Sequence, residues 1–135
     1  MLVFDTQDQE KPRSEPMPKG DPFGDMMNAP RKYVVSRTLK QPTWRDTTII
    51  RDNVIDAVRA LKAERGGTIA TDGSSQLVHA LLAHDLVDEL FLHVYPLVLG
   101  KGKRVLPEGL RTDFKLKSAT PYPTGVVGLD YVRER

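Results

Sequence analysis

The segment Gly73-Ser74-Ser75-Gln76 has the residue types of an anion-binding turn. It lies between a short apolar run and an amphipathic stretch, so a strand is expected to lead through the glycine into a helix. Gly73 permits a tight turn, and the backbone N–H groups that follow point to where a helix macrodipole favours an anion. The segment predicts a phosphate or pyrophosphate site. The same residues also suit a plain helix cap with Ser74 at the N-cap.

Ser36, Arg37 and Thr38 form a second candidate site, directly after the buried run Val34-Val35. In open α/β sheets, ligands bind at the edge where parallel strands have their carboxyl ends. One guanidinium flanked by two hydroxyl groups suits a phosphomonoester, because it offers charge-assisted and neutral hydrogen bonds together. A polar turn with a solvated arginine is the alternative interpretation.

Leu99 and Gly100 lie in a loop over residues 96–103 that is rich in glycine and lysine. Its two glycines, two positions apart, permit a close approach to a ligand, and its two lysines offer positive charge. The spacing does not match the Walker A phosphate-binding loop. The loop is therefore a candidate substrate or cofactor loop, with a plain glycine turn as the alternative.

Other kinds of catalytic centre find little support in the composition. The chain has no cysteine, which excludes a thiol nucleophile, a disulfide scaffold and Cys-ligated metals. It has three histidines, His79, His84 and His93. Their spacing does not suggest a metal centre, so no metal is expected, and no catalytic residue is assigned. The acidic residues Asp85, Asp88 and Glu89 are expected to be solvated charges beside a turn.

The elements that must position these residues alternate between strand and helix patterns. Apolar residues three and four apart predict helices over 53–65 and 75–84. Short apolar or alternating runs predict strands over 32–36, 47–50, 68–71, 89–95, 114–118 and 126–132. The alternation predicts an α/β fold with a mostly parallel mixed sheet, and the last two strands predict an antiparallel edge.

Length and composition limit the chain to one domain and a modest core. It has 135 residues, of which 39% are hydrophobic. Residues 1–31 are rich in proline and are expected to be irregular, and residues 32–135 are expected to form the α/β domain. The 20 basic and 18 acidic residues leave a net charge of +2, which disfavours a dedicated nucleic-acid binder. No apolar run suits a bilayer span or a signal peptide, so a cytoplasmic location is expected.

Five segments together resemble the dihydrofolate-reductase-like family that includes the reductase domain of bacterial riboflavin biosynthesis. They are Lys32–Leu39, Trp44–Thr47, Asp72–Leu77, Leu86–Leu90 and Pro96–Gly102. The resemblance covers residues 26–132, and their order and spacing carry it. It implies a three-layer α/β fold and NADPH as cofactor. It also implies that Ser36-Arg37-Thr38 takes the adenosine 2′-phosphate and that Gly73-Ser74-Ser75 cradles the pyrophosphate.

One departure from the family pattern concerns the amino-terminal region. The resemblance implies an initial strand, a helix and a second strand, which Met1–Phe4 and the proline-rich stretch are not expected to supply. The chain is therefore expected to lack the usual first strand and helix. An incomplete sheet exposes an edge that a second copy can cover. A homodimer is expected, with residues 89–95 near the contact.

Two functions follow from these observations. The first is an NADPH-dependent reductase that transfers hydride to a pteridine- or pyrimidine-like substrate, as in the riboflavin pathway. Its partners would be the dinucleotide and a small heterocycle, without nucleic acid or membrane. The second is a non-catalytic remnant of the same family that binds nucleotide or assembles with itself.

Overall fold

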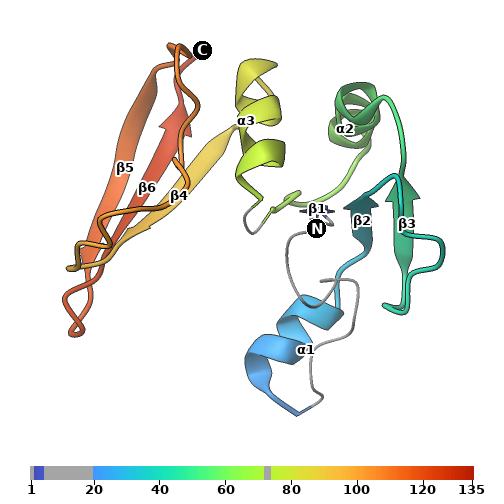
Figure 1. The fold of residues 1–135 in the computed structure, drawn as a ribbon, viewed down its shortest axis with the longest axis horizontal. Helices are drawn as coiled ribbons and strands as arrows, with labels where there is room; N and C mark the ends of the chain where they lie inside the picture. Colours follow the sequence, from blue (N-terminus) through green and yellow to red (C-terminus); the bar gives the residue numbers. More distant parts are fainter. Residues whose placement is uncertain (1, 5–19, 72–73) are drawn as a thin grey trace. The chain divides into compact units, whose positions relative to one another are not determined.

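The computed structural model describes residues 2–4, 20–71 and 74–135. The chain divides into two compact units, Met1–Val78 and His79–Arg135. Within the described residues, each unit contains a three-stranded sheet (Figure 1). None of the helices in these ranges is long and apolar enough to cross a membrane.

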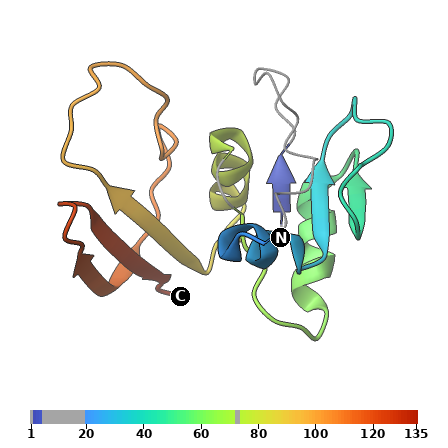
Figure 2. The same cartoon turned by 90° about the horizontal axis from the view of Figure 1, so that it is seen from below.

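The sheet of the first unit is parallel. Its strands are β1 (Leu2–Phe4), β2 (Lys32–Val35) and β3 (Thr47–Ile50), in that order. β1 pairs with β2 and β2 with β3, both in parallel, and Figure 2 shows the three strands next to one another. Because all three run the same way, their carboxyl ends meet at one edge of the sheet.

Two elements lie in the amino-terminal region that was expected to be irregular. β1 pairs with β2, so the prediction that Met1–Phe4 supplies no strand is wrong. Helix α1 (Pro22–Asn28) begins after Asp21, whose Oδ2 accepts a hydrogen bond from the Gly24 N–H at 2.8 Å. Asp at the N-cap followed by Pro at the first helical position is a favourable helix start. The sequence prediction missed α1 because proline interrupts regular structure at most positions, whereas at the first helical position it favours a helix.

Lys32 ties α1 to the amino ends of β2 and β3. Its side chain is fully buried, and its Nζ donates to the carbonyl oxygens of Asn28 at 2.5 Å and Arg45 at 3.2 Å. The ammonium lies 5.1 Å from the centre of the Trp44 ring, and Trp44 Nε1 donates to Asn28 Oδ1 at 2.8 Å. Burial lowers the pKa of Lys32, because water stabilises the ammonium better than the protein interior does.

Helix α2 (Val54–Ala63) confirms the first predicted helix, with Val58 at the centre of its buried stripe. Helix α3 (Ser75–Ala83) confirms the second and buries Leu77, Leu81 and Leu82.

The sheet of the second unit is antiparallel. Its strands are β4 (Glu89–Val94), β5 (Phe114–Pro121) and β6 (Val127–Arg133), in the order β4-β6-β5. These strands confirm the predicted antiparallel pair, and the segment between β5 and β6 forms a turn in which the Gly125 N–H donates to the Tyr122 carbonyl at 2.9 Å. Gly125, with a φ of +84°, occupies a backbone conformation in this turn that suits glycine.

The predicted α/β class, with both parallel and antiparallel pairing, is confirmed. One strand differs: residues 68–70 are not in a strand, and only Thr71 forms an isolated β-bridge. An apolar run shows that a segment can be buried, but a strand also needs a partner along its whole length.

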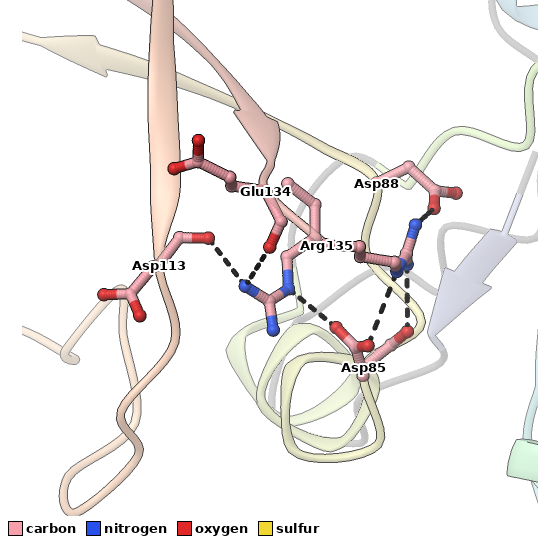
Figure 3. Close-up of polar contacts among 6 residues, drawn as sticks. Asp85, Asp88, Asp113, Glu134 and Arg135 are labelled. Atoms are coloured by element: carbon pink, nitrogen blue, oxygen red, sulfur yellow. Dashed lines mark hydrogen bonds and ion pairs between the residues drawn. The ribbon is translucent and has the colours of Figure 1, made fainter.

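A cluster of ion pairs holds the end of the chain to the turn after α3 (Figure 3). Arg133 Nε lies 2.7 Å from Asp85 Oδ1, and Arg135 Nη1 lies 2.7 Å from Asp88 Oδ1. Asp85 and Asp88 are exposed charges beside a turn, as expected, but the sequence did not predict their pairing with Arg133 and Arg135. Asp85 has a φ of +52° at the end of α3, a conformation that aspartate tolerates better than most residues. The hydrogen bond from Arg133, followed by the Arg135 contact, lowers the pKa of Asp85.

We predict that Asp85→Asn weakens the fold at neutral pH and that this effect fades in acid. The pKa of Asp85 is lowered by folding, so its carboxylate stabilises the native state above the ordinary value of 3.8. That contribution is lost as the pH falls below 3.8 through the lower folded-state pKa. Urea unfolding of the wild type and of Asp85→Asn, from neutral pH to below 3.8, measures the difference in the free energy of unfolding. This difference should shrink as the pH falls.

Asp113→Asn is the matched control for this experiment. Asp113 contributes its backbone carbonyl, which accepts a hydrogen bond from Arg133 Nη1 at 2.7 Å, and not its carboxylate (Figure 3). The control should therefore unfold at nearly the same urea concentration as the wild type. Equal losses in both variants, or a loss that is independent of pH, would contradict the role of the Asp85 carboxylate.

Candidate functional site

Ser36, Arg37 and Thr38 form a tight corner at the carboxyl end of β2. The Ser36 N–H donates to the Ile50 carbonyl at 3.1 Å, which extends the β2–β3 ladder by one bond. Ser36 Oγ accepts hydrogen bonds from the N–H groups of Thr38 at 3.2 Å and Leu39 at 3.0 Å. The buried serine thus shapes the corner, while Arg37 and Thr38 are left exposed.

The Arg37 guanidinium lies beside residues that follow β3. Its Nε is 3.8 Å from Asp52 Oδ1, and both side chains are exposed. Arg51 Nη1 donates to the Arg37 carbonyl at 3.4 Å. The structure therefore brings two guanidinium groups to the same strand edge, where the sequence predicted one.

Sequence reasoning missed Arg51, although a signal was present. Arg51 directly follows the predicted strand over residues 47–50, as Ser36 and Arg37 follow the strand before it. Residues after neighbouring parallel strands meet at one edge, so the two arginines could have been grouped. The sequence pattern does not show which strands are neighbours in the sheet, so the two arginines were not grouped.

The start of helix α3 contains a buried hydroxyl group, that of Ser74, without a hydrogen-bond partner among the described residues. The Ser74 carbonyl accepts from the Val78 N–H at 3.0 Å, which places Ser74 at the N-cap of α3 as predicted. Its backbone has a φ of +49°, which is strained for a residue with a Cβ. In the part of the chain that the structure describes, Ser74 Oγ is buried and has no hydrogen-bond partner. Gly73 lies outside the described residues.

A buried, unpaired hydroxyl beside free helix N–H groups is suited to hold an anion. Ser75 is half-buried and Gln76 is exposed in the first turn of the same nine-residue helix. The strand edge that carries Arg37 and Arg51 is called the arginine corner below. Both this helix start and the arginine corner belong to the first unit. Their donors suit a ligand that carries phosphate groups.

Leu99 and Gly100 belong to the second unit. The Leu99 side chain is 78% exposed, and Gly100 has a φ of +71°, which suits the glycine turn that was predicted there. Further along this segment, His79 Nε2 lies 3.0 Å from the Val105 carbonyl. That contact gives His79 a structural role and holds the segment to α3.

Residues with metal-binding side chains do not gather in the described ranges, which contain no group of three or more that could hold an ion. His84 Nδ1 lies 2.8 Å from the Ala80 carbonyl, one helical turn away. A polar hollow of about 370 Å³ lies at the amino ends of β2 and β3, lined by Arg31, Asp46, Thr47 and Thr48. It is at the opposite edge of the parallel sheet from the arginine corner.

The fold belongs to the α/β class, and comparison with known proteins shows to which family of that class the chain belongs. The family model of the RibD C-terminal domain matches residues 3–128. The chain belongs to this family. The match begins before residue 26, where the sequence resemblance started, and therefore includes most of β1 and all of α1.

The chain is also similar to individual proteins. It is 30% identical over 129 residues to the uncharacterized protein YyaP of Bacillus subtilis strain 168. The aligned residues cover 95% of this chain and 68% of that protein. A crystal structure of a protein assigned to riboflavin biosynthesis, from Shewanella sp. PV-4, matches 79% of this chain with a TM-score of 0.68 and 21% identity. A pyrimidine reductase-like protein from Corynebacterium diphtheriae NCTC matches 78% with a TM-score of 0.57 and 17% identity.

The chain spans 62% and 50% of the lengths of those two solved chains. At these levels of identity, the two structures establish the shared fold.

We predict that Ser74→Ala stabilises the protein and weakens phosphate binding. Removing a buried hydroxyl without a partner should raise the free energy of unfolding by about 1–3 kcal/mol. It should also lower the affinity for pyrophosphate if that group hydrogen-bonds to Ser74 Oγ. Urea unfolding and calorimetric titration with pyrophosphate measure the two effects.

Thr47→Val is the matched control, because Thr47 Oγ1 is also buried without a partner in the described ranges. Thr47 lies at the amino end of β3, away from the predicted site. This variant should gain stability and keep its pyrophosphate affinity. A loss of stability in Ser74→Ala would show that the hydroxyl is a structural cap.

Proposed function

We propose that this protein is a cytoplasmic NADPH-dependent reductase that transfers hydride to a pteridine- or pyrimidine-like substrate. The observation that carries the proposal is the arginine corner, where Arg37 and Arg51 meet at the carboxyl ends of two parallel strands. Membership of the RibD C-terminal domain family supports a reductase role. The pyrimidine reductase-like protein with the same fold supports a pyrimidine-type heterocycle.

The residues present fit a dinucleotide with a 2′-phosphate. Arg37, with Ser36 and Thr38, would hold the adenosine 2′-phosphate by charge-assisted hydrogen bonds. The segment Gly73–Gln76 would hold the pyrophosphate at the start of α3, where Ser74 Oγ lacks a partner. The bound cofactor supplies the hydride, and the chain supplies binding and orientation. Leu99 and Gly100, in the segment after β4, are proposed to form a substrate or cofactor loop.

We predict that Arg37→Ala weakens NADPH binding about ten- to a hundredfold, since charge-assisted hydrogen bonds contribute about 1.5–3 kcal/mol. NADH has a hydroxyl in place of the phosphate, so its affinity should hardly change. Gly73→Val should weaken both cofactors alike by crowding the shared pyrophosphate. Calorimetric titration of each variant with each cofactor measures these affinities.

Arg45→Ala provides the charge-matched control, because Arg45 precedes β3 and lies at the opposite edge of the sheet. It should leave the preference for NADPH unchanged. Equal weakening of NADH and NADPH by Arg37→Ala would contradict the assignment of this corner to the 2′-phosphate. Oxidation of NADPH in the presence of a ribosylamino-pyrimidine tests the reductase activity. Cofactor binding without turnover of any heterocycle would favour the non-catalytic alternative.

The second partner that we propose is another copy of this chain, paired along β4. In the described part of the second unit, β4 has one neighbouring strand, β6, so one of its edges is open. The other edge strand, β5, carries Lys115 and Lys117 and has an irregular register between Leu116 and Ser118. Lysines and bulges discourage edge-to-edge pairing. β4 has neither feature, which makes it the edge suited to self-association.

We predict that Val94→Lys converts a dimer into a monomer, because a lysine on an edge strand opposes pairing. Leu116→Lys is the matched control on β5, the strand that already carries lysines, because Val94 is 52% exposed and Leu116 is 50% exposed. Light scattering at micromolar concentration should report a dimer for the wild type and for the control. A wild-type monomer would rule out the dimer, and equal dissociation of both variants would exclude β4 as the contact.

A further inference from the structure

We propose that Arg51 and Asp52, the two residues after β3, set how strongly this corner prefers a phosphorylated ribose. Arg51 would act as the second cation for the phosphate. Asp52 would act as an internal anion that the phosphate must displace from Arg37. The inference deepens the proposed function, on which it rests, because it concerns the same nucleotide site.

The geometry brings the three charged groups to one place. Arg37 Nε is 3.8 Å from Asp52 Oδ1, and Arg51 Nη1 is 3.4 Å from the Arg37 carbonyl oxygen. The ladder between β2 and β3 pairs Val35 with Ile50, so the residues that follow each strand emerge at the same edge. Arg51 is therefore held near Arg37 by the backbone as well as by its own hydrogen bond.

The charge balance at the corner favours an added anion. Two guanidinium groups and one carboxylate leave one positive charge, whereas a phosphomonoester carries about −1.5 to −2 at neutral pH. Both guanidinium groups can contact a phosphate that carries nearly two charges. The carboxylate of Asp52 repels the same phosphate and competes with it for Arg37.

The contact between Arg37 and Asp52 is loose enough to be exchanged. Their side chains are 84% and 75% exposed, so water screens the attraction. Exposed ion pairs of this kind are weak. A phosphate that also contacts Arg51 offers Arg37 a stronger partner. Asp52 should therefore lower the affinity for a phosphorylated ribose without abolishing it.

The experiment titrates the full-length chain calorimetrically with adenosine 2′,5′-bisphosphate and, separately, with adenosine 5′-monophosphate. Asp52→Asn should tighten binding of the bisphosphate about two- to fivefold, the size expected for an exposed ion pair. Arg51→Gln should weaken it about tenfold. Neither variant should change the affinity for the monophosphate by a comparable factor.

The double variant Arg37→Ala/Asp52→Asn tests whether Asp52 acts through Arg37. If it does, Asp52→Asn should tighten binding much less in the Arg37→Ala background than in the wild type. An equal gain in affinity in both backgrounds would mean that Asp52 only repels the ligand. That result would overturn the claim that the phosphate displaces Asp52 from Arg37.

Matched controls come from the pair Arg45 and Asp46, which lie 3.5 Å apart and are also exposed. This pair precedes β3 and so lies at the amino edge of the sheet. Arg45→Gln and Asp46→Asn change the net charge by the same amounts and should leave both affinities unchanged. Effects of equal size in the controls would show that only net charge matters, which would overturn the proposal.

The outcomes separate this inference from the proposed function. If the wild type binds the bisphosphate more tightly than the monophosphate but neither Asp52→Asn nor Arg51→Gln alters that preference, the roles of Arg51 and Asp52 are wrong and the nucleotide site stands. If the wild type shows no preference for the bisphosphate, the 2′-phosphate site is wrong, and both proposals fail.

Discussion

The register between β2 and β3 is the constraint on which the arginine corner depends. It pairs Val35 with Ile50, and the bond from the Ser36 N–H to the Ile50 carbonyl continues the ladder into the turn. A slip of one residue would turn every side chain of a strand to the other face. Arg37 and Arg51 would then no longer leave the sheet together. A guanidinium pair suited to phosphate is thus a consequence of strand pairing.

The amino end of the same strand pair shows what fixes this register. The buried ammonium of Lys32 donates to the carbonyl groups of Asn28 and Arg45. The backbone N–H of the same residue donates to the Asp46 carbonyl at 2.9 Å. A charge without water is stabilised only by such contacts, which shifts in register would break. The lowered pKa of Lys32 reflects the loss of water. Burying it makes one alignment of β2 against β3 much better than its neighbours.

The local pattern of the sequence predicted the elements better than their partners. Periodicity placed α2 and α3 to within about two residues of the observed ends. The three-residue strand β1 is too short for a periodic pattern, and the strand predicted over 68–71 has only a bridge at Thr71. Arg37 was found because it follows a single strand. Arg51 and Asp85 depend on contacts between segments far apart in the chain, which no local pattern contains.

Two arginine–aspartate pairs in this chain show how geometry separates structure from recognition. Arg133 meets Asp85 at 2.7 Å, is only 19% exposed, and also donates to the Asp113 carbonyl at 2.7 Å. Several short bonds on one guanidinium make it hard to replace any partner. Arg37 meets Asp52 at 3.8 Å with 84% of its side chain exposed. A loosely held cation at a strand edge keeps its hydrogen-bonding capacity for a ligand, so the weaker pair is the one suited to bind.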